Sequence, residues 1–167
     1  MNPRQQERQL QVWLEKHQGL LVKVARSFAR NRHDQDDLLQ EIGLQLWRSI
    51  PNLNPDVAES TWIYRVALYT AISWTRKDSK HREKRQTLAE EPIANEPNPD
   101  PRVDWLYEKI AELNPIDRSL ALMMLDGIQH RDIAETLGLS VTNVGVRLHR
   151  IKKHLSSLLD QETTDEL

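Results

Sequence analysis

The residues best suited to chemistry in this chain form one basic helical face near the C-terminus. Cations there could neutralise phosphates, while hydroxyl and amide groups could hydrogen-bond to base edges in the DNA major groove. The side chains on this face are Thr142, Asn143, Arg147, Arg150, Lys152 and Lys153. An ordinary amphipathic helix with a solvated basic face would have a similar composition. The elements before this face must therefore decide between the two interpretations.

Those elements predict a helix-turn-helix between Gln129 and Leu155. Ala134 is small enough for a close helix crossing, Gly138 can adopt the positive φ that ends a helix, and Ser140 is a favoured N-cap. A helical stripe of apolar residues follows: Val141, Val144, Leu148, Ile151, Leu155 and Leu158. In this motif the second helix enters the major groove, so we predict that the segment binds DNA.

A second set of residues interleaves aromatic rings with cations. A helix predicted from about Ser60 to Arg82 places Ile63, Val66, Ala67, Thr70, Ala71 and Trp74 inward. Its outward face aligns Trp62, Arg65, Tyr69 and Arg76, and the basic segment that includes Lys77 follows. Bases of single-stranded nucleic acid stack on rings while cations hold the backbone. Half-buried aromatics that only cover the helix packing are the alternative.

A third helix, predicted from about Asp34 to Ser49, carries acids and amides. Leu38, Leu39, Ile42 and Leu46 should be buried, whereas Asp37, Gln40, Glu41, Gln45 and Arg48 share a polar face. The acids have no His partner at ligand spacing on that face, which argues against a metal site. Acids in the first turn of a helix also interact favourably with the helix dipole, which explains their presence without a ligand. This face is either solvated or a protein-docking surface, and its composition does not separate the two.

Nothing in the sequence predicts an enzyme. The six His are scattered, and no nucleotide-binding loop, catalytic triad or metal-ligand cluster is present. We therefore expect no catalytic residues, no metal and no cofactor. The chain has no Cys, which excludes disulfides and thiolate sites and is compatible with the cytoplasm. The N-terminus lacks a signal-peptide core and no apolar run approaches a membrane span, so membrane insertion is not expected.

Composition and patterning predict an all-α protein with two small helical domains. The 167 residues are 38% hydrophobic and 29% charged, with a formal net charge of only −2. A Pro-rich acidic segment, residues 87–104, reads as a flexible linker. It separates an N-terminal domain (1–86) from a C-terminal helix-turn-helix domain (105–160). Within the first domain we expect a helix or helix pair from Arg4 to Arg30, broken at Gly19, and a loop at Pro51–Pro55.

Three motifs in this order resemble the extracytoplasmic-function (ECF) sigma factors of bacterial RNA polymerase. DDLLQEIGLQLWRSI resembles the core-binding helix of that family, and STWIYRVALYTAISWTRKDSKHREKR resembles its −10 and melting segment. LNPIDRSLALMMLDGIQHRDIAETLGLSVTNVGVRLHRIKKHLSSLL resembles its −35 helix-turn-helix domain. The resemblance implies a subunit that directs the polymerase core to promoters and aids promoter opening, with catalysis left to the polymerase.

The resemblance also implies roles for individual residues. The surface for the polymerase core would comprise Asp37, Leu38, Gln40 and Glu41. The −10 single strand would be bound by Asn52, Asn54, Trp62, Tyr64, Arg65, Tyr69, Arg76 and Lys77. The −35 duplex would be bound by Ser140, Thr142, Asn143, Arg147, His149, Arg150 and Lys153. The long linker, together with the frequent regulation of this family by anti-sigma factors, suggests an anti-sigma factor as a further partner.

Several residues depart from the family pattern. Gly43 stands where an aromatic is usual, Leu68-Tyr69 replaces a frequent Arg-Asn, and Gly145-Val146 replaces a frequent Lys-Ser. These changes put the DNA sequence preference in question. Two alternatives to a sigma factor stay open at this point: a free-standing helix-turn-helix regulator whose N-terminal helices bind a protein, and a helical interaction protein that binds no DNA.

Overall fold

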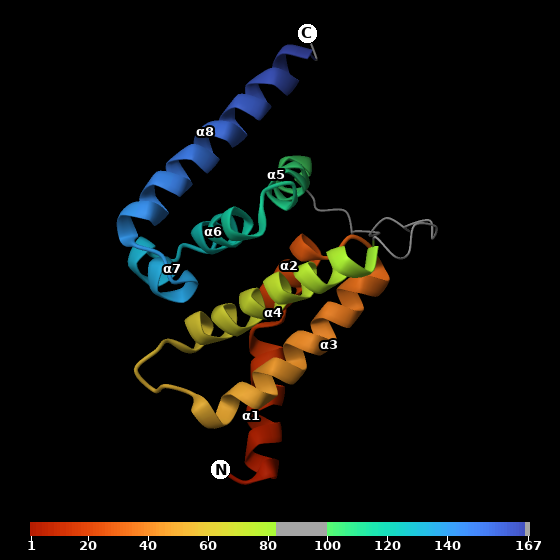
Figure 1. The fold of residues 1–167 in the computed structure, drawn as a ribbon, viewed down its shortest axis with the longest axis vertical. Helices are drawn as coiled ribbons and strands as arrows, with labels where there is room; N and C mark the ends of the chain where they lie inside the picture. The colour runs from red at the N-terminus through yellow and green to blue at the C-terminus, as the bar shows by residue number, and fades with distance from the viewer. Residues whose placement is uncertain (83–99, 166–167) are drawn as a thin grey trace. The chain divides into compact units, whose positions relative to one another are not determined.

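The computed structural model describes residues 1–82 and 100–165, and all regular elements in these ranges are helical. The chain divides into two compact units, Met1–Glu96 and Pro97–Leu167 (Figure 1). The all-α fold with two helical domains is thus confirmed. Most of the predicted linker, residues 87–99, lies outside the described residues. No helix among the described residues is long and apolar enough to cross a membrane.

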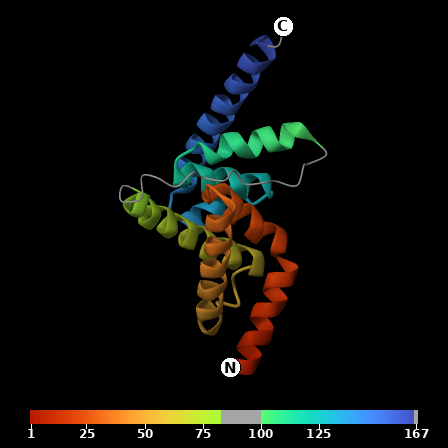
Figure 2. The ribbon, with the colours of Figure 1, turned by 90° about the vertical axis from the view of Figure 1, so that its right-hand side faces the viewer.

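The first unit begins with two helices, α1 (Pro3–Lys16) and α2 (Gln18–Phe28), which confirms the predicted helix pair (Figure 2). The break was predicted at Gly19, which is wrong: it lies at His17, and Gly19 is inside the first turn of α2. The reason is tertiary, because His17 Nε2 hydrogen-bonds to Glu59 Oε1 at 2.8 Å, far along the chain. Trp13, one turn before the break, is completely buried.

The next pair of helices, α3 (Arg32–Ser49) and α4 (Glu59–Arg82), forms most of the first core. Asn31 caps α3, because its Oδ1 accepts a hydrogen bond from the Asp34 N–H at 2.8 Å. Helix α4 packs against both α2 and α3 (Figures 1 and 2). Two neighbours bury a wider face of α4 than one apolar stripe predicts. That face adds Tyr64, Leu68 and Ile72 to the predicted Ile63, Ala67, Thr70 and Ala71, while Val66 and Trp74 are half-buried.

Between α3 and α4 the chain forms the predicted loop, apart from one short 3-10 turn, η1 (Ile50–Asn52). Ile50 is buried, whereas Pro51 to Asp56 are exposed. The Asn54 Oδ1 accepts a hydrogen bond from the Asp56 N–H at 2.9 Å, a local turn that does not require a tertiary contact.

The first helix of the second unit starts four residues before residue 105, where the sequence predicts the C-terminal domain to begin. Helix α5 (Pro101–Ala111) is capped by Asp100, whose side chain accepts a hydrogen bond from the Arg102 N–H, and Pro101 occupies its first position. The prediction that the linker extends to Asp104 is therefore wrong, since Asp104 lies within the first turn of α5. Helix α6 (Pro115–Leu125) follows, capped by Asn114 as predicted. It ends before Gly127, which has a φ of 74°.

Helices α7 (His130–Leu137) and α8 (Val141–Asp165) form the predicted helix-turn-helix. Gly138 has a φ of 67°, and the Leu139 N–H donates to the Ala134 carbonyl at 2.9 Å, which closes α7. Ser140 Oγ accepts from the Asn143 N–H at 3.1 Å and so caps α8. Figure 1 shows α8 as one unbroken helix. Its buried stripe is Val144, Leu148, Ile151 and Leu155.

Candidate functional site

A hollow in the first unit lies between α3, η1 and α4. It gathers four of the residues predicted to bind single-stranded DNA: Asn52, Trp62, Arg65 and Tyr69. Gln45, Arg48, Ser49, Val66 and Thr70 complete the lining. Aromatic rings, cations and amides from three elements therefore face one space, which is the chemistry that base stacking and backbone neutralisation need.

The indole of Trp62 has a defined orientation in this hollow. Its Nε1 donates a hydrogen bond to Ser49 Oγ at 3.1 Å, and that hydroxyl in turn donates to the Leu46 carbonyl at 2.7 Å. The ring is half-buried, so one side packs on the helices while the rest borders the hollow. A serine at the end of α3 thus positions an aromatic ring on α4.

The hollow is also lined by exposed residues, among them two cations. Tyr69 is 45% exposed, and the Arg65 guanidinium carbon lies 6.0 Å from the centre of its ring, within cation–π range. Arg48 joins these residues from α3. Helical periodicity does not predict a DNA contact for Arg48, because it places this residue with the acidic residues of its own helix. Only the packing of α4 brings it to this side.

The other predicted single-strand residues do not line this hollow. Tyr64 is 1% exposed and belongs to the core, so a direct DNA contact through its side chain is not supported. Asn54 is exposed in its own turn, and Arg76 is exposed farther along α4. Lys77 lines a different hollow.

That second hollow, between α3 and α4, contains most of the predicted polymerase-binding residues. Asp37, Gln40 and Glu41 line it together with Lys77. Leu44, Gln45, Thr70, Ser73 and Trp74 are the remaining lining residues. Asp37 and Gln40 are exposed, whereas Leu38 is completely buried. The prediction that Leu38 contacts a partner is therefore corrected: it packs inside the unit and supports the helix that carries the polar face.

The start of α4 is tied to the break between α1 and α2 through Glu59. Its Oε1 lies 2.8 Å from His17 Nε2 and 3.0 Å from Lys16 Nζ. The His17 hydrogen bond, followed by that of Lys16, lowers the pKa of the Glu59 carboxyl below its ordinary value. These contacts hold the beginning of α4 in place, and Trp62 lies one turn farther along the same helix.

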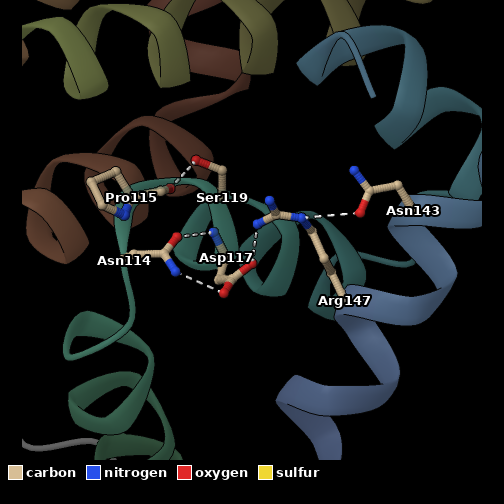
Figure 3. A network of polar contacts seen from close by, with 6 residues as sticks. All are labelled: Asn114, Pro115, Asp117, Ser119, Asn143 and Arg147. Carbon is tan, nitrogen blue, oxygen red and sulfur yellow. Dashed lines mark hydrogen bonds and ion pairs between the residues drawn. The ribbon is translucent and has the colours of Figure 1, made fainter. Parts of the chain in front are cut away.

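In the second unit, α8 presents most of its predicted DNA-binding residues to solvent. Ser140, Thr142, His149, Arg150 and Lys153 are exposed, and Asn143 is half-buried. Arg147 differs, because its side chain is only 34% exposed and its Nη1 lies 2.9 Å from Asp117 Oδ1 on α6 (Figure 3). Among the described residues, no group of three His, Asp or Glu side chains could hold a metal ion.

Two valines near the start of α8 are exposed to solvent. Val141 was assigned to the apolar stripe, which is wrong, since it is 51% exposed at the first position of the helix. Val146 is 44% exposed. Helical periodicity could not predict the exposure of Val141, because this residue continues the spacing of the buried stripe. The burial by α6 and α7 begins one turn later, at Val144.

Comparison with known proteins identifies the family to which both units are similar. Residues 13–81 match the model of sigma-70 region 2, and residues 104–155 match that of sigma-70 region 4. The RNA polymerase sigma factor CnrH of Cupriavidus metallidurans is 30% identical over 166 residues, which cover 89% of this chain and 85% of CnrH. The ECF sigma factor SigE of Mycolicibacterium smegmatis is 25% identical over 159 residues. That match covers 89% of this chain but only 61% of SigE.

Two solved structures show a similar fold. CnrH in complex with the cytosolic domain of CnrY has a TM-score of 0.66 at 23% identity, covering 93% of this chain and 90% of that one. The sigma factor RpoE of Bartonella quintana, in complex with the anti-sigma factor NepR, has a TM-score of 0.75 at 17% identity, covering 88% and 94%. A free-standing regulator is disfavoured by the region 2 match. The chain therefore belongs to the ECF sigma factors, a family of RNA polymerase sigma factors.

Proposed function

We propose that the first unit performs both polymerase docking and −10 single-strand binding, on adjacent faces of α3 and α4. The polar face formed by Asp37, Gln40 and Glu41 is assigned to the polymerase core. The hollow lined by Arg48, Asn52, Trp62, Arg65 and Tyr69, here called the α3–α4 hollow, is assigned to unpaired −10 bases. The observation that supports this most strongly is the convergence of these rings and cations from separate elements.

The second unit is assigned to the −35 duplex. The start of α8 would enter the major groove, where Thr142 and Asn143 can hydrogen-bond to base edges. Val141 and Val146 are exposed on the same helix and can contact thymine methyl groups. Arg150 and Lys153 would hold phosphates. In this proposal the chain acts in the cytoplasm, and the polymerase supplies the catalysis.

An anti-sigma factor is the further partner that we propose. Its support is the fold shared with CnrH and RpoE, whose structures were solved with CnrY and NepR respectively. Affinity capture from native cells, with and without the inducing condition, tests this proposal. Recovery of the polymerase alone in both conditions would contradict it.

Single-strand binding is tested with holoenzyme assembled from polymerase core and the full chain, and a promoter fragment that is unpaired at −10. Replacing Tyr69 by Ala should weaken binding by about fivefold or more, because stacking contributes roughly 1–3 kcal/mol per base. Arg65→Ala and Arg48→Ala should each make the negative slope of log affinity against log salt shallower by about 0.7, because each removes one phosphate contact to a single strand. Arg8→Ala, an exposed cation on α1, is the control. Equal losses in the control would argue against the α3–α4 hollow.

Polymerase docking is tested by charge reversal on α3. Asp37→Lys and Glu41→Lys should abolish co-purification with the polymerase core, because like charges would replace complementary ones at the interface. The matched control is Asp36→Lys, which reverses an exposed acid one residue away that does not line the second hollow. Docking that survives both reversals would contradict the assignment of this face.

A further inference from the structure

Arg147 connects two helices of the second unit through a polar bridge, here called the α6–α8 bridge (Asn114, Asp117, Asn143 and Arg147). Its Nη1 lies 2.9 Å from Asp117 Oδ1 on α6, and its Nε donates to Asn143 Oδ1 on α8 at 3.2 Å (Figure 3). The guanidinium therefore contacts a helix 30 residues away in sequence and a neighbour on its own helix at the same time.

Asp117 is itself held in place. The Asp117 N–H donates to Asn114 Oδ1 at 2.9 Å, and Asn114 Nδ2 donates to Asp117 Oδ2 at 2.8 Å (Figure 3). One carboxylate oxygen is thus bound by the cap of α6 and the other by Arg147. The first turn of a helix also favours a negative charge. The side chains of Asp117 and Arg147 are 22% and 34% exposed, so water screens this ion pair less than a fully exposed one.

The bridge determines which atoms Asn143 presents. Arg147 donates to the Asn143 carboxamide oxygen, while no described residue accepts a hydrogen bond from Asn143 Nδ2. Asn143 lies in the first turn of α8, where a recognition helix contacts base edges. A carboxamide held in this orientation turns its N–H donors away from Arg147 (Figure 3). Such donors match guanine O6 and N7, adenine N7 or thymine O4, and they do not match the cytosine amino group.

We propose that Asp117 is a positioning residue for −35 recognition, which acts through Arg147 to hold Asn143 as an outward-facing donor. This inference rests on the proposed role of α8 at the −35 duplex. It assigns a DNA-reading effect to an acid on α6, outside the helix-turn-helix. It also changes the role of Arg147 from a direct DNA contact to a connection between α6 and the side chain that reads the base.

The sign of the charge effect makes the proposal testable. Removing an acid near bound DNA ordinarily strengthens binding, because a repulsive charge is lost. Asp117→Asn should instead weaken holoenzyme binding to a −35 duplex by roughly fivefold or more, since the charged hydrogen bond to Arg147 is lost. The probe is the −35 sequence that wild-type holoenzyme selects from a random duplex library. Glu135→Gln, an exposed acid on α7, is the matched control and should bind equally or more tightly.

A second measurement separates positioning from general stability. Selection repeated with Asp117→Asn, and with Arg147→Lys, should relax the preference at the base pair contacted by Asn143 and retain it elsewhere. Arg147→Lys keeps the cation but cannot contact Asp117 and Asn143 as a fork. The salt slope should stay that of wild type in both variants, because neither removes a phosphate contact.

The outcomes discriminate between the two levels of proposal. If wild-type holoenzyme selects a −35 sequence and Asp117→Asn selects it equally well, the positioning role is wrong and the proposed function stands. A uniform loss of affinity for all sequences would also overturn the positioning role in favour of a structural one. If wild-type holoenzyme selects no −35 sequence, both proposals fail.

Discussion

At the scale of single residues, one carboxylate in each unit links two helices. Glu59 links the beginning of α4 to Lys16 and His17 at the break between α1 and α2. Asp117 performs the same role in the second unit by linking α6 to Arg147 on α8. Neither contact is local in sequence, so each one restricts the relative placement of two helices rather than the stability of one.

The Glu59 contact should make the stability of the first unit depend on pH. Its hydrogen bonds to His17 and Lys16 lower the pKa of Glu59. A lowered carboxyl pKa stabilises the fold above the unfolded value, about 4.5, and this contribution is lost as the pH falls through the folded value. Glu59→Gln should therefore cost about 0.5–1 kcal/mol at pH 6, because the group is partly exposed, and much less near pH 3. Urea unfolding at the two pH values measures the difference.

Glu7→Gln is the control for this experiment, since Glu7 is an exposed acid on α1. Its free energy of unfolding should differ little from wild type at either pH. A Glu59→Gln penalty that is equally large at pH 3 would mean that packing, and not the charge of Glu59, explains the loss.

At the scale of elements, helix α8 has a side-chain cap at its start but a helix-destabilising glycine in its interior. Ser140 caps its first turn, and four buried residues attach it to the unit. Gly145 lies between these contacts without a steric reason for glycine: a Cβ there would meet only the His130 ring nitrogen, at 4.0 Å. Its extra backbone freedom in the unfolded chain therefore lowers helix stability with no compensating close approach.

Replacing Gly145 by Ala should stabilise the second unit by about 0.4–1 kcal/mol, because the unfolded chain loses entropy and no clash arises. Gly138→Ala provides the opposite case, since its φ of 67° strains any residue with a Cβ, and it should destabilise the unit. Thermal unfolding of both variants measures the pair. Destabilisation by Gly145→Ala would show that α8 needs flexibility or space at this position.

The whole molecule consists of two units that each have a core of their own. The first is centred on residues such as Trp13, Leu38 and Ile63, and the second on Leu122 and Leu148. In the proposed function, separate cores would allow each unit to support the surface that binds its own DNA element. Specificity would then arise from the combined use of both units rather than from the affinity of either one.

Independent cores predict independent unfolding. Ile63→Ala should lower the stability of the first unit by about 2–5 kcal/mol and leave the transition of the second unchanged, because the lost packing is confined to one core. Leu148→Ala is the reciprocal variant. Differential scanning calorimetry of the full chain resolves the two transitions. A single transition that shifts in both variants would show that the units unfold together.

Local patterns in the sequence determined the helices, their caps and the chemistry of their polar faces. The Asn114–Pro115 start, the Gly138 end and the Ser140 cap depend on interactions within four or five residues, so they could be predicted without the fold. The mixture of rings, cations and amides predicted nucleic acid as the ligand class, because these residue types recur at helical spacing.

Only the tertiary structure decided which residues on these faces are available to a partner. Tyr64 and Leu38 became core residues and Val141 became exposed, because burial depends on which neighbouring helix covers a face. Arg48 lines the α3–α4 hollow because α3 packs on α4. Helical periodicity shows which residues share a face, but contacts between distant segments decide what that face meets.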